Sequence, residues 1–101
     1  MTSSNKPPEG KPPQNQLQIQ LPPEVALGAY ANLTLVNHTE TEFVFDFIYV
    51  LPLEPRATVR SRIISSPKHA KRFLNALADN VARYEGSYGT IDAGVGKMPI
   101  Q

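Results

Sequence analysis

Basic side chains are concentrated in one stretch of this 101-residue chain. No Asp or Glu occurs between Pro55 and Ala78, yet six of the ten Lys and Arg residues lie there. A cluster of cations attracts phosphate groups. The pattern therefore predicts a nucleic-acid-binding surface, single strands included, made by Arg60, Arg62, Lys68, Lys71 and Arg72, with Tyr30 as a ring on which bases could stack. The alternative is a solvated basic surface that acids on adjacent strands balance: Glu42, Asp46 and Glu54.

Asp46 is the acidic side chain with the most unusual setting, because apolar residues surround it in sequence from Phe43 to Leu51. A buried carboxylate without a partner is costly. We expect Arg62 to pair with it in a bidentate ion pair that serves the structure.

Catalysis is the alternative role for Asp46, and the sequence argues against it. No second carboxylate accompanies Asp46, no Ser, Cys or Lys nucleophile has a recognisable setting, and no glycine-rich phosphate loop is present. The sequence predicts a protein that is not an enzyme, with no catalytic residue and no cofactor.

Metal and membrane sites are not expected either. The chain has no cysteine, and its two histidines, His38 and His69, lie far apart in sequence without a companion ligand. No apolar run approaches the roughly 20 residues of a membrane span, and the N-terminus lacks the hydrophobic segment of a signal peptide. We therefore expect a cytoplasmic protein that does not contact membranes.

The segment from Phe43 to Leu51 predicts a strand whose two faces are both apolar. Strands of this kind are covered on both sides. One helix covers one face only, so the second face is expected to meet another copy of the chain, a partner or a ligand. We expect a homodimer or a larger assembly.

The order of elements predicts an α+β fold, with a four-stranded antiparallel sheet followed by one C-terminal helix. The expected strands are 16–21, 29–37, 42–51 and 57–65. Ser66 followed by Pro67 predicts the helix start, and Gly86 or Gly89 predicts its end. Its apolar stripe is Ala70, Phe73, Leu74, Leu77, Val81 and Tyr84. Because this stripe needs an apolar seat, the aromatic row of the sheet is read as core and not as a stacking platform.

Strand registers follow from the expected loops. A loop over 52–56 places Leu51 opposite Ala57, and therefore Asp46 opposite Arg62, Phe47 opposite Ser61 and Ile48 opposite Arg60. A turn over 38–40 places Leu33 opposite Phe45 and Asn32 opposite Asp46. The sheet then has a dry face, made by Ala31, Leu33, Leu35, Phe43, Phe45, Phe47, Tyr49, Val59 and Ile63. Its mixed face holds Tyr30, Asn32, Thr34, Val36, Val44, Asp46, Ile48, Val50, Thr58, Arg60, Arg62 and Ile64.

The composition divides the chain into three parts. Residues 1–16 hold four of the ten prolines and no aromatic or branched apolar residue, so a disordered arm is expected. Residues 17–89 form the single domain, and 90–101 a flexible tail.

Several motifs resemble a family of small bacterial and archaeal proteins that is catalogued as a domain of unknown function. They are Phe45-Asp46-Phe47, the run Arg60 to Ile64, the run Ser66 to Arg72, then Asn80, Tyr84-Glu85 and Tyr88-Gly89. The resemblance covers about 17–91, excludes the proline-rich arm and implies no particular activity. A weaker, architectural analogy is to PUR and Whirly single-stranded nucleic-acid binders, which pair two units of four strands and a helix.

Two functions follow from these observations. One is a homodimeric nucleic-acid-binding module that uses the basic stretch. The other is an interaction or assembly subunit whose sheet face docks on a larger protein, with the proline-rich arm as tether. Salt sensitivity separates the two, because phosphate contacts weaken steeply as salt rises.

Overall fold

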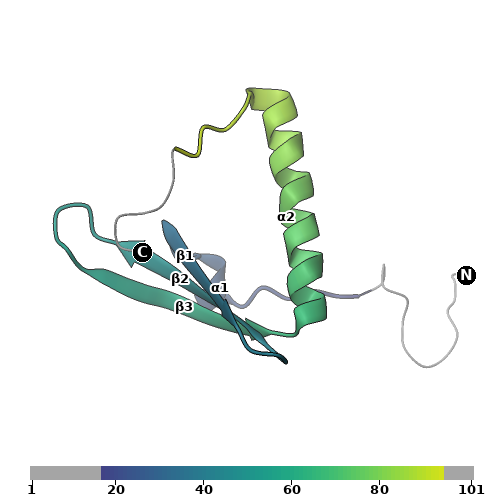
Figure 1. The fold of residues 1–101 in the computed structure, drawn as a ribbon, viewed down its shortest axis with the longest axis horizontal. Coiled ribbons are helices and arrows are strands. Elements are labelled where there is room, and N and C mark those ends of the chain that lie inside the picture. The colour runs from purple at the N-terminus through teal and green to yellow at the C-terminus, as the bar shows by residue number, and fades with distance from the viewer. Residues whose placement is uncertain (1–16, 95–101) are drawn as a thin grey trace, which may run out of the picture.

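The computed structural model describes residues 17–94 (Figure 1). A single helical turn, α1 (Pro23–Ala26), precedes three antiparallel strands, β1 (Leu33–His38), β2 (Phe43–Val50) and β3 (Ala57–Ser65). They form one sheet in the order β1-β2-β3, and the long helix α2 (Pro67–Tyr88) follows. The expected α+β class, antiparallel sheet and C-terminal helix are confirmed. The predicted arm at 1–16 and the residues 95–101 of the predicted tail lie outside the described residues.

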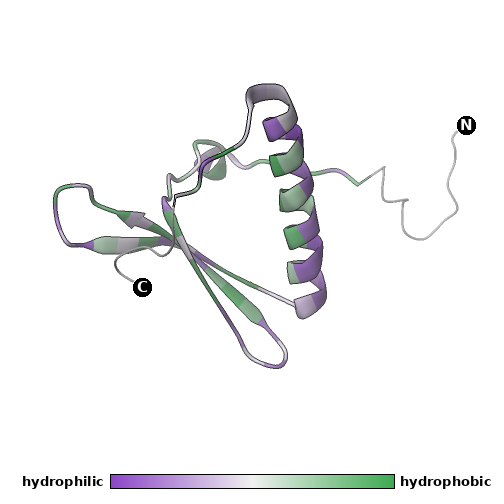
Figure 2. Cartoon of the chain, turned by 45° about the horizontal axis from the view of Figure 1, so that its top comes forward, coloured by the Kyte–Doolittle hydropathy of each residue, from purple (hydrophilic) through white to green (hydrophobic). Residues whose placement is uncertain are grey.

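The predicted first strand is absent from this sheet. Residues 17–22 are extended but pair with no strand among the described residues, and Leu17, Ile19 and Leu21 are exposed. Figures 1 and 2 both show this segment passing behind α2 on its way to α1, without lying alongside a strand. Pro22 and Pro23 begin α1 directly after it. Because proline fixes φ and lacks an N–H, a strand in this segment could not continue past Leu21.

The predicted register between β1 and β2 is wrong by three positions. Leu33 pairs with Ile48 and not with Phe45, and Leu35 pairs with Asp46. The strands are joined by a four-residue loop, in which the N–H of Thr39 donates to the carbonyl of Glu42. Since an odd shift exchanges the two sides of a strand, β1 presents the opposite side chains to each face from those predicted.

Between β2 and β3, the predicted pairs Asp46–Arg62 and Phe47–Ser61 are confirmed, and the predicted pair Ile48–Arg60 is wrong. A β-bulge shifts the register after Phe47, so Ile48 pairs with Val59 and Val50, in place of Leu51, pairs with Ala57. Arg60 is the extra residue of the bulge and has no partner across the ladder. Bulges re-aim side chains in this way.

The two faces of the sheet therefore differ in content from those predicted. The phenylalanine face carries Thr34, Val36, His38, Phe43, Phe45, Phe47, Tyr49, Thr58, Ser61 and Ile63. The Asp46 face carries Leu33, Leu35, Val44, Asp46, Ile48, Val50, Val59, Arg62 and Ile64. Leu33, Leu35 and Val59 thus lie on the Asp46 face, and Thr34, Val36 and Thr58 on the phenylalanine face. This exchange leaves apolar side chains on both faces.

Few side chains are buried in the described residues. The apolar ones are Leu33 of β1 and its neighbours Phe45 and Ile48 of β2, and the polar one is Asp46 of β2. Small domains bury a low fraction of their surface and have little stability to spare. The core of the described residues is small even by this measure.

Helix α2 begins and ends as the sequence predicts. Ser66 is the N-cap, and its Oγ accepts a hydrogen bond from the backbone N–H of His69 at 3.1 Å. Pro67 stands at the first helical position, where its missing N–H costs nothing. Gly89 ends the helix with a φ of 100°, which glycine adopts without strain. Neither helix of the described residues is both long and apolar enough to cross a membrane.

The apolar stripe of α2 is only partly packed against the sheet. Figure 1 shows α2 rising at a steep angle from the end of β3, and Figure 2 shows hydrophobic residues along its sheet-facing side. Phe73 reaches the sheet, where its ring meets that of Phe45 edge to face at 5.6 Å. Leu74, Leu77 and Tyr84 remain at least half exposed. The stripe was expected to cover the phenylalanine face, and only its first half approaches that face.

Candidate binding surfaces

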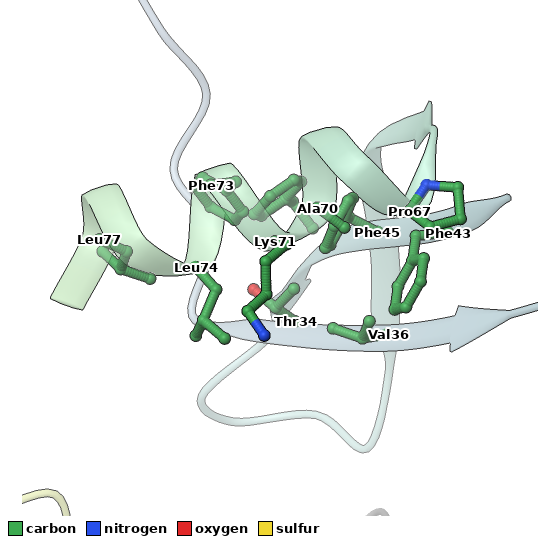
Figure 3. Close-up of a pocket in the computed structure, with 11 residues that line it drawn as sticks. Thr34, Val36, Phe43, Phe45, Pro67, Ala70, Lys71, Phe73, Leu74 and Leu77 are labelled. Atoms are coloured by element: carbon green, nitrogen blue, oxygen red, sulfur yellow. The ribbon is translucent and has the colours of Figure 1, made fainter.

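A groove separates the first half of α2 from the phenylalanine face (Figure 3). We call it the aromatic groove. It has a volume of about 590 Å³ and is lined by Thr34, Val36, Phe43, Phe45, Phe47, Pro67, Ala70, Lys71, Phe73, Leu74 and Leu77. A pocket of this size and composition is typical of a binding site for an apolar group. The sequence predicted a filled core at this place.

The aromatic rings of this face contact one another. Phe43 lies nearly parallel to Phe45 and to His38, with ring centres 6.4 and 5.4 Å apart. Phe45 is buried, and Phe43 and Phe47 are half-buried. Tyr30 is exposed and packs edge to face on Tyr49, with ring centres 6.0 Å apart. The aromatic row of β2 is therefore a packing surface that the described residues cover only in part. Tyr30 lies at the edge of this row.

On the opposite face, Arg62 holds Asp46 in the expected bidentate arrangement. Its Nε donates to Oδ1 at 2.7 Å and its Nη2 donates to Oδ2 at 2.8 Å. These hydrogen bonds and the positive charge lower the pKa of Asp46 against the opposing effect of desolvation, and they raise the pKa of Arg62. The Asp46 carboxylate stays ionised near neutral pH, with both oxygens already occupied. This is the geometry of a structural ion pair.

The five basic residues predicted to bind phosphates do not form one patch. Arg62 lies on the Asp46 face, whereas the bulge sends Arg60 to a hollow lined by Phe47, Ser61 and Ile63 of the other face. Lys71 lines the aromatic groove. With 100° per residue, Lys68 and Arg72 lie on the side of α2 away from its stripe.

These cations also differ in their partners. Arg56 donates from Nε to Oε1 of Glu54 at 2.9 Å, and Arg62 is paired with Asp46. Arg60, Lys68, Lys71 and Arg72 form no ion pair within residues 17–94. No acid stands in the first turn of α2, where a positive helix dipole favours anions. Four cations are thus available to an external anion, although on separate surfaces.

The histidines do not assemble a metal site. His38, the last residue of β1, stacks on Phe43 of β2. His69 belongs to the first turn of α2. Residues 17–94 contain no group of three or more His, Cys, Asp or Glu that could hold a metal ion.

Asn32 has a role that sequence reasoning missed. Its Oδ1 accepts from the N–H of Val50 at 2.8 Å, and its Nδ2 donates to the carbonyl of Val50 at 3.2 Å. The side chain thus imitates a strand residue beside the end of β2. The predicted register placed Asn32 opposite Asp46. In the structure Asn32 lies just before β1, where its backbone N–H donates to the carbonyl of Ile48.

Comparison with known proteins gives a family but no activity. The sequence profile of DUF3467, described as a protein of unknown function, matches residues 1–93. The chain belongs to this family. The DUF3467 match includes the proline-rich arm, which the resemblance noted above left outside. No curated protein and no solved structure matches the chain, so the analogy to PUR and Whirly modules gains no support.

Proposed function

We propose that this DUF3467 chain is a non-enzymatic protein-interaction module that acts as a homodimer. The exposed aromatic groove, with the stripe of α2 beside it, carries the proposal. The chemistry of a site supports function where fold alone does not. Here the available surface is apolar, and the Asp46 carboxylate that might have served catalysis is occupied by Arg62.

The burial of the described chain supports a dimer. Burying a Leu or Phe side chain fully contributes about 1.5–3 kcal/mol. Phe73, Leu74, Leu77, Val81 and Tyr84 are all between about one third and three fifths exposed, so each forgoes a large part of this contribution. Soluble monomers rarely leave a continuous apolar surface of this kind open. A second copy is a partner that is always present when the chain is made.

The Asp46 face would then be the docking surface for a larger protein. Leu35, Val59 and Ile64 are exposed there around the ion pair. Exposed apolar side chains beside an arginine are common in protein interfaces, and Asp46 brings no unpaired charge to this patch because Arg62 already holds it. Capture from a lysate with wild-type protein, compared with an Ile64→Asp variant, would identify such a partner.

The oligomeric state tests the proposal directly. Sedimentation equilibrium of the full chain at micromolar concentration should give the mass of a dimer. A stable, folded monomer under these conditions would contradict the proposed function.

Nucleic-acid binding is the second candidate, because Arg60, Lys68, Lys71 and Arg72 have no ionic partner in residues 17–94. Fluorescence anisotropy with labelled single- and double-stranded oligonucleotides tests it at about 50 and 200 mM salt, a range over which phosphate contacts are lost. The double variant Lys68→Ala/Arg72→Ala should then abolish binding. Arg56→Ala is the matched control, since Arg56 is already paired with Glu54. Absence of binding at low salt would leave the protein-interaction reading alone.

A further inference from the structure

We infer that the aromatic groove is filled by α2 of a second copy, which lies antiparallel to the first α2 about a two-fold axis near Leu77 and Ala78. This inference rests on the proposed homodimer and names its interface. Each copy has both a groove and an α2, so two copies would fill each other's grooves through a single interface.

The stripe of α2 is longer than the groove beside it. Helix α2 has 22 residues, about 33 Å at 1.5 Å per residue. Its first half lines the groove as far as Leu77, and its second half continues the stripe with Val81, Tyr84 and Tyr88. Figure 1 shows this second half standing clear of the sheet, and Figure 3 shows Leu77 at the open end of the groove. The second half therefore has an apolar side that no strand of residues 17–94 covers.

Antiparallel pairing brings the two halves together. With the axis near Leu77, Leu74 of one copy meets Val81 of the other, and the rings of Tyr84 and Tyr88 reach the partner's groove. The same contacts recur on the other side of the axis, as a two-fold interface requires. Helices pack at 8–10 Å between axes, which suits Leu74, Leu77 and Val81 at the centre of this contact.

The charges beside the stripe select the antiparallel direction. Lys71 and Glu85 are 14 residues apart, so they lie within about 40° of each other on the same flank of α2. Ala78 is midway between them in sequence. An antiparallel pair brings the same flank of the two helices together and places Lys71 opposite Glu85 of the second copy. A parallel pair puts these flanks on opposite sides of the interface, so Lys71 and Glu85 do not meet. Oε2 of Glu85 accepts from the N–H of Ile91 at 2.9 Å, which leaves Oε1 for Lys71.

Other segments of the chain are poorer occupants. Residues 1–16 contain Met1 but no aromatic or branched apolar residue, and 95–101 contain three apolar residues besides proline. The extended segment with Leu17, Ile19 and Leu21 is the competing occupant, since these side chains are exposed. It has no charge to pair with Lys71, because its polar residues are glutamines.

Single cysteines test the geometry, because the natural chain has none. Ala78→Cys places a thiol beside the axis, and mild oxidation by diamide should give a covalent dimer on a non-reducing gel. Ala76→Cys is the matched control, since it places the thiol 160° away around the helix and should remain monomeric on the gel. A dimer in solution that cross-links through position 76, or through neither position, overturns the inference while the proposed homodimer stands.

Charge substitutions test the energetics by sedimentation. Val81→Arg should raise the dimer dissociation constant by at least about 30-fold, the effect of losing a hot-spot residue, whereas Ala76→Arg should not change it. Lys71→Glu and Glu85→Lys should each weaken the dimer, and the double variant should restore it. This rescue keeps the test valid if Val81→Arg fails to fold. A dimer broken by Ile19→Arg but not by Lys71→Glu or Glu85→Lys alone would assign the groove to residues 17–21. A monomeric wild-type chain would overturn both proposals.

Discussion

Arg62 and Asp46 meet across β2 and β3 through two parallel hydrogen bonds of 2.7 and 2.8 Å. The carboxylate is buried, whereas the guanidinium is largely exposed at its outer side. A charge-assisted pair of this geometry orders the middle of the sheet, because it joins the central strand β2 to the edge strand β3 at the level of the small core.

Acid should weaken the fold through this pair. The pKa of Asp46 is lowered in the folded state from its ordinary value of 3.8, chiefly by hydrogen bonds from Arg62. Its stabilising contribution is therefore complete at pH values above 3.8 and is lost as the pH falls through the lowered folded-state pKa. Urea unfolding at pH 7, 4 and 2.5 should show this loss in the wild type. The Asp46→Asn variant should lack the share of this pH-dependent loss of stability that is due to Asp46. An equal decline in the wild type and the variant would contradict the prediction.

The neighbouring arginines should respond differently to truncation. Arg62→Ala leaves the buried carboxylate of Asp46 without a partner, so the urea midpoint should fall clearly. Arg60→Ala removes a bulge side chain that forms no ion pair in the described residues, so its effect should be within about 0.5 kcal/mol. Similar effects of the two substitutions on urea unfolding would argue against the bulge.

Phe45 should be the most sensitive apolar position. It is buried in the sheet and meets Phe73 of α2 at 5.6 Å. Removing a buried phenylalanine side chain costs about 3–5 kcal/mol, which a core of three apolar residues cannot absorb. Phe45→Ala should therefore lack a cooperative thermal transition by circular dichroism. Leu53→Ala, at a loop position that is 94% exposed, should melt like the wild type.

The N-cap of α2 should contribute less to the free energy of unfolding than Phe45 does. Ser66→Ala removes the acceptor for the N–H of His69 and should lower the free energy of unfolding by about 1 kcal/mol. Ser66→Asp should retain most of it, because aspartate accepts the same hydrogen bond and favours the positive end of the helix. Chemical denaturation of the three proteins measures the difference. No loss in Ser66→Ala would mean that the first turn is held by packing alone.

Local signals in the sequence determined the elements that depend on near neighbours. Ser66 and Pro67 determine where α2 begins, because a hydroxyl acceptor and a proline suit consecutive positions of a helix start. Position 46 falls opposite position 62 because the extra residue of the bulge offsets the one-residue error that the predicted loop introduced next to Ala57. The ion pair was therefore predicted correctly from the sequence.

The tertiary structure decided the features that depend on competition between distant segments. Several registers satisfy the apolar pattern of β1, since β2 is apolar on both sides, and the four-residue loop at 39–42 selects one of them. The bulge at Arg60 depends on how β2 and β3 twist together, and it separates Arg60 from Arg62. The angle at which α2 leaves β3 opens the aromatic groove, because a periodic stripe specifies an apolar side of a helix but not the surface that it meets.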